Sequence, residues 1–357
     1  MKTKPIIEVL NNRPSEKTPI WFMRQAGRYL PEYGELRSKT KSFMESVLTP
    51  QIAAEITLQP IRRFDLDAAI IFSDILVLPY AMGVDVQFHE GVGPVLNYEF
   101  NPIDPTANLS RGEKFDETVS KICQTLSLVK KSLSDTTIAT IGFAGAPWTV
   151  ACYMLERNRK KGGDFEEARQ IAYQFPLQFE QLLDAITNAT IDFLLAQIYA
   201  GAEVIKVFDS HAGLLGEKEF KKFVINPMIK IVSRIKILHP KILIIGFPRR
   251  AGLLYNDFVA ETKINCVAVD HTLPLKFIKD FLQTQCVVQG NLDNILLTLD
   301  LNYAQRAISR SANQILTELN NSSSKAFIFN LGHGCLPSTK IDNIEFLIKK
   351  VRNFQKR

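Results

Sequence analysis

Residues 19–33 read Pro19-Ile-Trp-Phe-Met-Arg-Gln-Ala-Gly-Arg-Tyr-Leu-Pro-Glu-Tyr33, a short apolar run followed by a turn between two arginines. The run at 20–23 has the length and aromatic content of a buried strand, and it stops at Arg24. Gly27 would let the backbone bend closely, so that Arg24 and Arg28 present two guanidinium groups to one small volume. Such a pair suits a ligand with several carboxylates or phosphates, because each guanidinium can bind an oxyanion through two hydrogen bonds. The segment alone is equally compatible with two arginines solvated in a surface loop.

Seven more apolar or β-branched runs follow, separated by stretches of helical pattern. Near-continuous apolar strands that alternate with helices indicate a parallel sheet covered on both faces, and eight such units indicate a closed barrel. An open, doubly wound sheet is the alternative, but its glycine-rich phosphate turn is missing after the first run. No linker divides the chain, so we expect residues 1–357 to form one α/β domain, a single (β/α)₈ TIM barrel. The expected strands are 20–23, 68–72, 137–143, 203–208, 242–247, 266–269, 286–288 and 326–329.

Amphipathic segments lie between most of these runs and after the last one, as a barrel with outer helices requires. The long connection between the second and third runs also holds a possible hairpin, formed by 84–88 and 95–100. The expected helices are 50–63, 115–132, 165–200, 217–238, 252–262, 275–282, 303–319 and 342–355.

Composition limits the class of protein. Of the 357 residues 46% are hydrophobic, which is ample for a full core. No apolar run approaches a membrane span or a signal peptide, so we expect a cytoplasmic enzyme or binding protein with no membrane partner. A net charge of +6, from 43 Lys plus Arg against 37 Asp plus Glu, favours an anionic partner but is too small and dispersed to indicate nucleic acid. The five scattered cysteines predict reduced core thiols.

Polar residues and tight glycine turns follow every expected strand. The active site of such a barrel is built at the carboxyl ends of its strands, so these segments should meet at one face. Each has an ordinary structural alternative: Asp74 and Ser210 could be helix N-caps, His211 and His271 could be rim histidines, and Asp209 could close an ion pair. Their convergence favours an active site. In chain order the segments are 24–28, 73–74, 142–148 with Tyr153, 209–213, 247–250, 270–272, 290–291 and 330–334.

A metal site is not expected. His333-Gly-Cys335 has a His-x-Cys spacing, but zinc needs at least three protein ligands and no His or Cys follows Cys335. The other cysteines fall inside expected strands or helices. No Walker-type phosphate loop is present either.

Several of these segments together resemble one known family. Residues 21–33 match the N-terminal signature of the uroporphyrinogen decarboxylases, and 142–149, Gly-Phe-Ala-Gly-Ala-Pro-Trp-Thr, match their second signature. The segments 71–76, 208–210, 288–293 and 330–334 fit as well. The resemblance covers Pro19 to beyond Pro337, nearly the whole chain, and the first signature is highly specific.

The resemblance implies a cofactor-free enzyme of tetrapyrrole and haem synthesis. It would convert the four acetate side chains of uroporphyrinogen III to methyl groups, giving coproporphyrinogen III and carbon dioxide. It also implies a single (β/α)₈ barrel that forms a homodimer with the two active-site mouths facing one another.

The same resemblance implies roles for individual residues. Asp74 would hydrogen-bond the pyrrole N–H groups and stabilise positive charge on the protonated ring. Arg24 and Arg28 would bind acetate and propionate carboxylates, and one of them, or a water it orients, would deliver the proton. The remaining substrate contacts implied are Gln25, Ala26, Gly27, Arg37, Tyr153, Ser210 and His333.

The chain departs from the family pattern at positions that the resemblance does not assign to catalysis. These departures concern loop closure and dimer contact, and the two adjacent arginines could strengthen carboxylate binding. They are Gly34 for arginine, Arg157 for glycine, His211 for tryptophan, Arg249-Arg250 for Lys-Gly, and Asn294 and Lys340 for prolines.

Two other functions stay open on the sequence. One is a corrinoid-dependent methyltransferase of the same superfamily, for which His333-x-Cys335 argues, although those relatives carry zinc ligands and lack the arginine turn. The other is a tetrapyrrole-binding carrier on the same barrel, which would have no need of Asp74 at the barrel centre.

Overall fold

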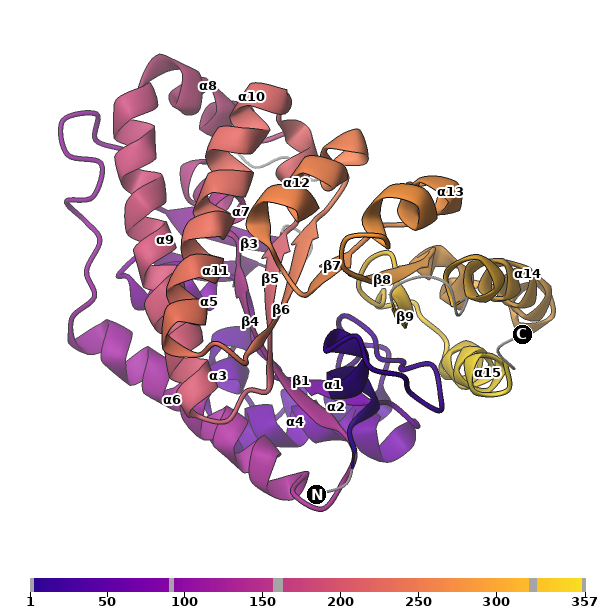
Figure 1. Cartoon of the computed structure of the whole chain (residues 1–357). Coiled ribbons are helices and arrows are strands. Elements are labelled where there is room, and N and C mark those ends of the chain that lie inside the picture. The colour runs from indigo at the N-terminus through magenta and orange to yellow at the C-terminus, as the bar shows by residue number, and fades with distance from the viewer. Residues whose placement is uncertain (1–2, 90–92, 157–162, 321–325, 355–357) are drawn as a thin grey trace.

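A parallel β-sheet curls through the centre of the molecule, and helices cover its outer side (Figure 1). The computed structural model describes residues 3–89, 93–156, 163–320 and 326–354. Within them, seven strands pair in the order β1-β4-β5-β6-β7-β8-β9, each parallel to its neighbours. Parallel strands joined by helices give the TIM-barrel type of fold that the sequence predicts. The strands are β1 (Ala68–Ile70), β4 (Ala139–Gly145), β5 (Val204–Asp209), β6 (Leu243–Pro248), β7 (Cys266–Ala268), β8 (Val287–Leu292) and β9 (Phe327–Leu331).

The segment 20–23, predicted as the first strand, is not a strand, and that prediction was wrong. Only Ile20 forms a β-bridge, parallel to Phe329 of β9. Backbone hydrogen bonds still tie the segment to both edges of the sheet: the N–H of Phe329 donates to Pro19 O at 2.8 Å, and the N–H of Asp67 donates to Ile20 O at 2.9 Å. The Asp67 carboxylate accepts from the N–H of Ile20 at 2.7 Å, so a side chain takes the place of a ladder bond. The sheet is therefore not a closed eight-stranded barrel, although this segment lies between its edges.

The strands are buried along almost their whole length because helices cover one face and side chains fill the other. Lys206 of β5 is fully buried in the interior. Its ammonium nitrogen lies 4.9 Å from the ring centroids of Trp21 and Phe208 and 5.3 Å from that of Phe247. Burial lowers the pKa of Lys206 to about 7. Its ammonium group has no hydrogen-bond partner among the described residues and contacts aromatic rings instead.

Proline stands in the first turn of several helices, where its missing N–H leaves no bond unmade. Pro176 divides the predicted helix 165–200 into two, whereas a π-helical turn joins α10 to α11 over the predicted helix 217–238. The helices are α1 (Pro5–Leu10), α2 (Pro31–Arg37), α3 (Phe43–Leu48), α4 (Pro50–Arg63), α5 (Val77–Ala81), α6 (Glu113–Ser132), α7 (Pro147–Leu155), α8 (Glu166–Gln174), α9 (Pro176–Tyr199), α10 (Glu217–Phe220), α11 (Asn226–Leu238), α12 (Tyr255–Thr262), α13 (Leu275–Phe277), α14 (Leu301–Leu319) and α15 (Ile341–Arg352).

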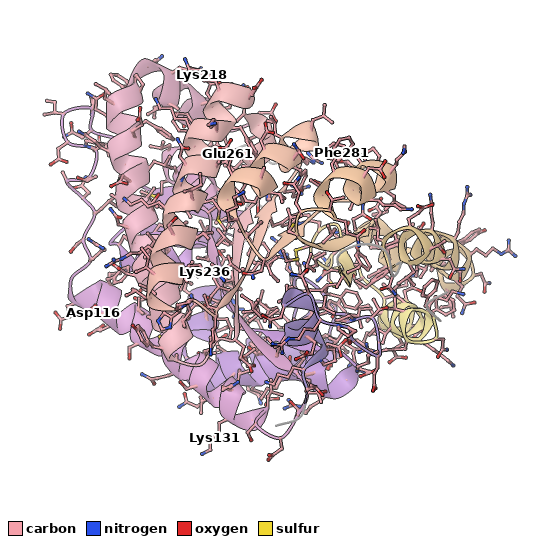
Figure 2. The ribbon with its side chains drawn as sticks, in the orientation of Figure 1. Asp116, Lys131, Lys218, Lys236, Glu261 and Phe281 are labelled. Atoms are coloured by element: carbon pink, nitrogen blue, oxygen red, sulfur yellow. The ribbon has the colours of Figure 1, made fainter. Side chains whose placement is uncertain are left out.

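A separate antiparallel hairpin, β2 (Asp85–His89) and β3 (Gly93–Asn97), stands where the sequence predicts one. Charged side chains such as Asp116, Lys131 and Lys218 project outward from the surrounding helices (Figure 2). Among the described residues, none of the helices combines the length and apolar character that crossing a membrane requires.

Candidate active site

The predicted site residues lie around one end of the barrel, which we call the mouth. Because neighbouring parallel strands end at the same edge of the sheet, residues far apart in the sequence converge there. The residues are Arg24 and Arg28 after the first segment, Asp74 after β1, Tyr153 in α7, Ser210 after β5 and His333 after β9.

Gln25 holds the arginine turn in place. Its buried side chain donates from Nε2 to Ala68 O at 2.9 Å and accepts the N–H of Phe22 at 3.2 Å. The Tyr29 hydroxyl donates to Gln25 O at 2.5 Å. The Gln25 amide is therefore used within the protein, and it fixes the turn to the start of β1.

The bend of this turn lies at Arg24, not at Gly27 as predicted. Arg24 has φ 57°, in the left-handed region that costs a non-glycine residue about 1–2 kcal/mol. Gly27 has no such backbone, and a methyl group there would meet nothing nearer than Arg24 O at 3.4 Å. The Arg24 side chain lies across Gly334, where an added Cβ would come within 2.6 Å of Arg24 Cδ. The strained backbone thus directs an exposed guanidinium over the mouth.

Asp74 presents a half-buried carboxyl beside this turn. Its Oδ1 accepts the N–H of Leu76 at 2.9 Å, as a local cap would. Burial raises the pKa of Asp74, while that hydrogen bond and the positive charge of Arg24 oppose the shift. The carboxyl is thus partly desolvated and lies within the field of one arginine, where a second cation would favour its ionised form.

His333 lies among cations contributed by several loops. Burial, then the charges of Arg249, Arg24, Arg250 and His271 in that order, lower the pKa of His333 to about 3. The imidazole is therefore neutral at physiological pH, with one donor and one acceptor nitrogen. These charges come from the loops after β6 and β7 and from the arginine turn, and close approaches of Gly332 to His271 and of Gly334 to Arg24 bring two of these segments against the loop after β9.

The arginines of the mouth form no ion pair within the described part of the chain, although the charge of Asp74 acts on Arg24 and that of Asp270 on Arg249. Arginines elsewhere, such as Arg63 and Arg352, pair with Asp or Glu, at 2.9 Å and 2.7 Å respectively. An unpaired guanidinium cluster is costly through mutual repulsion unless an anionic ligand binds it. The mouth is therefore suited to a ligand that carries several negative charges. The arginines concerned are Arg24, Arg28, Arg249 and Arg250.

An aromatic wall forms another side of the mouth. The His211 ring lies 4.2 Å from the Phe165 ring and 5.3 Å from the Tyr153 ring, centroid to centroid. The N–H of His211 donates to the Thr149 hydroxyl at 3.1 Å, which links this wall to α7. Ser210, half-buried, precedes His211 directly, so the structure brings Tyr153 and Ser210 to the same wall.

Arg37 is engaged within the protein. Its guanidinium donates to Thr40 O at 3.0 Å and to the Thr40 hydroxyl at 2.8 Å, at the end of α2. It lies near Arg28, since both charges lower the pKa of Tyr33 against the effect of burial. The Arg37 guanidinium therefore already has hydrogen-bond acceptors beside it in the chain.

The structure shows what surrounds several of the residues that depart from the family pattern. Asn294 donates to Gly334 O at 2.7 Å, Lys340 pairs with Asp300, and Gly34 lies exposed in α2 with open space around it. Arg157 lies outside the described residues.

Asp209 is a second acidic group of the mouth; the sequence placed it in a segment expected to reach the active site, with an ion pair as the alternative, and gave it no role of its own. It is buried at the end of β5 and accepts hydrogen bonds from the Thr149 hydroxyl at 2.5 Å and from the N–H of His211. Burial raises the pKa of Asp209 to about 7 in spite of these donors. The burial that determines this behaviour has no signal in the sequence.

The free energy of unfolding should therefore depend on Asp209. The folded protein keeps a proton on Asp209 up to about pH 7, whereas the unfolded chain releases it near pH 4, so stability falls as pH rises through this window. Relative to Asp209→Asn, wild-type protein should lose roughly 3 kcal/mol between pH 5 and pH 8. Urea unfolding of both proteins at the two pH values measures this difference, and an unchanged difference would contradict the assignment.

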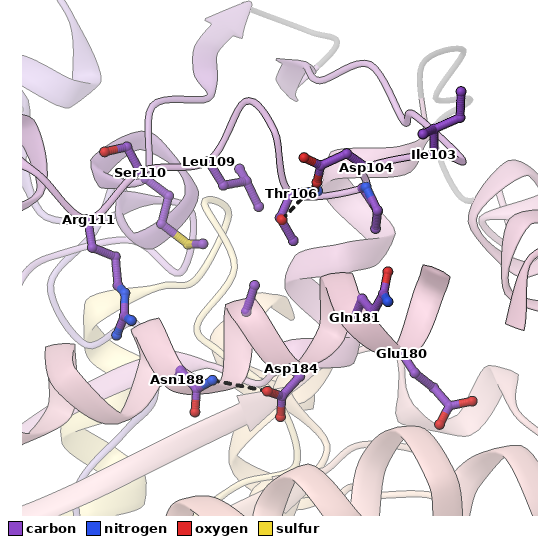
Figure 3. Close-up of a pocket in the computed structure, with 13 residues that line it drawn as sticks. Ile103, Asp104, Thr106, Leu109, Ser110, Arg111, Glu180, Gln181, Asp184 and Asn188 are labelled. Atoms are coloured by element: carbon purple, nitrogen blue, oxygen red, sulfur yellow. Dashed lines mark hydrogen bonds between the residues drawn. The ribbon is translucent and has the colours of Figure 1, made fainter. Parts of the chain in front are cut away.

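A hollow of about 760 Å³ lies on the outer surface between residues 103–111 and α9, away from the strand ends (Figure 3). Several of its polar groups are already paired with one another or with neighbours: Asn188 donates to Asp184 at 3.1 Å, and Glu180 pairs with Lys222. None of the predicted site residues lines it, so its chemistry contrasts with that of the mouth.

Cys335, two residues after His333, is a buried thiol. It lies against the Tyr29 hydroxyl, and burial raises its pKa to about 12. Within the residues that the structure describes, no three His, Cys, Asp or Glu side chains gather in a metal-binding group.

Comparisons with known proteins agree with this architecture. Among solved structures, a methyltransferase from Methanosarcina mazei superposes with a TM-score of 0.76 at 17% identity over 97% of both chains. A B12-independent methionine synthase from Shewanella sp. W3-18-1 gives 0.57 at 10% identity over 85% of both chains. At these identities the likeness shows the fold alone.

The sequence comparisons are more specific. A uroporphyrinogen decarboxylase from Rickettsia rickettsii (strain Sheila Smith) is 44% identical over 361 residues, which cover 99% of this chain and 98% of the relative. A uroporphyrinogen decarboxylase from Chelativorans sp. (strain BNC1) is 42% identical over 356 residues, covering 99% of each. The family profile described as Uroporphyrinogen decarboxylase (URO-D) matches residues 1–354. With the profile and these relatives spanning nearly its whole length, the chain belongs to the uroporphyrinogen decarboxylase family.

Proposed function

We propose that this protein decarboxylates uroporphyrinogen III. It converts the four acetate side chains to methyl groups and releases coproporphyrinogen III and carbon dioxide, a step of porphyrin and haem synthesis. Family membership supports the choice of substrate. The observation that carries the proposal is the cluster of arginines that form no ion pair, beside the half-buried Asp74, which fits a polycarboxylate whose core becomes cationic.

The reaction explains why a carboxylate stands among these arginines. Each turnover breaks one carbon–carbon bond, releases carbon dioxide and adds one proton to the remaining carbon. An acetate on a pyrrole has no neighbouring carbonyl to accept the electron pair, so the ring itself must first be protonated. Asp74 would accept hydrogen bonds from the pyrrole N–H groups and stabilise this cation. The cation would in turn favour the ionised form of Asp74, against the effect of burial.

The other side chains of the mouth would bind the carboxylates of the macrocycle. Arg24 and Arg28 bind them through charge-assisted hydrogen bonds, and one of the two, or a water it orients, delivers the proton. Residues 25–27 shape the turn between these arginines. The hydroxyls of Tyr153 and Ser210 and the neutral imidazole of His333 supply further donors, and Arg37 contributes once a carboxylate replaces Thr40 as its partner. The proposed contacts are Arg24, Gln25, Ala26, Gly27, Arg28, Arg37, Asp74, Tyr153, Ser210 and His333.

The test is an anaerobic incubation of metal-stripped protein with uroporphyrinogen III, with the products oxidised and separated by chromatography. We expect the hepta-, hexa- and pentacarboxylates to appear in turn, followed by the tetracarboxylate. That series in the absence of added metal or cofactor would also support a cofactor-free reaction. Unchanged substrate, from protein that circular dichroism shows to be folded, would overturn the proposal.

A homodimer with facing mouths is part of the proposal. Exposed apolar side chains on loops at the strand ends support it: Leu253, after β6, is 75% exposed, and Ile295, after β8, is 48% exposed. Sedimentation equilibrium measures the mass directly, and a monomer at micromolar concentration would count against it. We also expect the cytoplasm as its location, which cell fractionation tests.

A further inference from the structure

Arg249 reaches the mouth from the side opposite to Arg24. It directly follows β6, which is the fourth strand along the sheet from the 20–23 segment in either direction, by way of β1, β4 and β5 or of β9, β8 and β7. The two arginines therefore start from opposite sides of the barrel.

The Arg24 side chain lies across Gly334, the residue after His333, and the His333 imidazole is also within the field of Arg249. Arg249 is half-buried, and its charge is the one that acts most strongly on the His333 imidazole, ahead of Arg24. Burial and then the charge of Arg250 lower the pKa of Arg249, the charge of Asp270 opposes the shift, and the charge of Arg24 makes a smaller contribution to lowering it. The charges of both arginines thus act on one neutral imidazole at the mouth. Among the described residues neither arginine forms an ion pair with a carboxylate, although the charge of Asp270 acts on Arg249.

The backbone that carries Arg249 is held rigidly. The N–H of Arg249 donates to Asp209 O at 3.0 Å, and its carbonyl accepts the N–H of Gly213 at 3.1 Å. The next residue, Arg250, has φ 61°, and its N–H donates to the buried Asp270 carboxylate at 2.7 Å. Such a fixed loop reduces the entropy lost when Arg249 binds a ligand.

We infer that Arg249 and Arg24 together bind one propionate carboxylate of the substrate, with His333 as a third donor. This inference rests on the proposed function and assigns a contact that the family resemblance does not imply. A propionate fits better than a reacting acetate for a chemical reason. Two guanidinium groups on a carboxylate stabilise its negative charge, and a carboxylate that must release its electron pair to leave as carbon dioxide would be slowed by that stabilisation. A propionate keeps its charge throughout.

The product separates the two kinds of carboxylate, because coproporphyrinogen III keeps the propionates and has no acetates. The dissociation constant of coproporphyrinogen III is measured by anaerobic ultrafiltration, followed by oxidation and quantification. Arg249→Gln should raise this constant about tenfold or more, and should raise KM for uroporphyrinogen III by a similar factor while kcat changes less. Arg249→Lys keeps the charge but loses the bidentate contact, so its dissociation constant should lie between those of Arg249→Gln and wild type.

Arg306→Gln is the matched control, since it removes one exposed arginine from α14, and it should leave both values unchanged. If Arg249→Gln binds coproporphyrinogen III as tightly as wild type does, the inference is overturned. A rise in KM together with that result would assign the contact to an acetate, and an unchanged KM would mean that Arg249 makes no contact with the substrate. Failure of the proposed function looks different: wild-type protein would then release no carbon dioxide, yet the effect of Arg249→Gln on product binding would still support this contact.

Discussion

Asp74→Asn is expected to lower the rate of carbon dioxide release from uroporphyrinogen III by about 100-fold to 1,000-fold, the usual loss when one group that stabilises transition-state charge is removed. Asparagine has the same shape and can still accept the N–H of Leu76, which the aspartate accepts at 2.9 Å, so the loop should keep its conformation. What disappears is the negative charge facing the protonated ring. KM should not rise, because the lost charge repels the carboxylates of the substrate. Single-turnover measurement of carbon dioxide separates the chemical step from binding.

Asp116→Asn is the control for this variant, because Asp116 is an exposed carboxylate at the start of α6 (Figure 2). It should keep the wild-type rate. A rate for Asp74→Asn within twofold of wild type, from folded protein, would show that the carboxylate charge is not used in the chemical step. A large rise in KM with unchanged kcat would assign Asp74 to binding instead.

The sheet could be predicted because its strands are buried on both faces. The run 242–247 has no polar side chain, and 286–288 and 326–329 are likewise apolar, a pattern that belongs to parallel strands rather than to half-exposed ones. The first run, 20–23, is equally apolar and yet is not a strand. Its conformation depends on Asp67, whose carboxylate accepts the N–H of Ile20 where a strand would form a backbone hydrogen bond. The two residues are 47 positions apart, so no local pattern in the sequence shows this contact.

The site could be predicted in position but not in conformation. Arg24 and Asp74 follow apolar runs, and topology alone then places both at the mouth. The sequence suggests Gly27 as the bend because glycine adopts left-handed backbone most easily, whereas the structure holds Arg24 in that conformation. The burial of Asp209, and the reach of Arg249 across the mouth, depend on packing that only the assembled barrel creates.

Gly334 provides a test of where the Arg24 guanidinium must lie. A Cβ at this position would come within 2.6 Å of Arg24 Cδ and 2.8 Å of its Cγ. The backbone around Gly334 has little freedom to yield, since its carbonyl accepts from Asn294 at 2.7 Å and the next N–H donates to Met23 O at 2.9 Å. Gly334→Ala should therefore displace the Arg24 side chain without removing its charge. Because misplacing a positioning group by about 1 Å can cost 100-fold, we expect kcat/KM to fall by roughly 10-fold to 100-fold.

Gly34→Ala is the matched control, because the added methyl group would meet no atom within 4 Å beyond its chain neighbours and its own helix backbone, and it should leave kcat/KM unchanged. Arg24→Gln should lose at least as much activity as Gly334→Ala. In the Arg24→Gln background, Gly334→Ala should cost little more, since the two changes remove the same contact and their effects cannot add. Fully additive losses would mean that Gly334 acts on the site by another route. Wild-type activity in Gly334→Ala would mean that catalysis tolerates a displaced Arg24, and the binding role would then rest on Arg28 and Arg249.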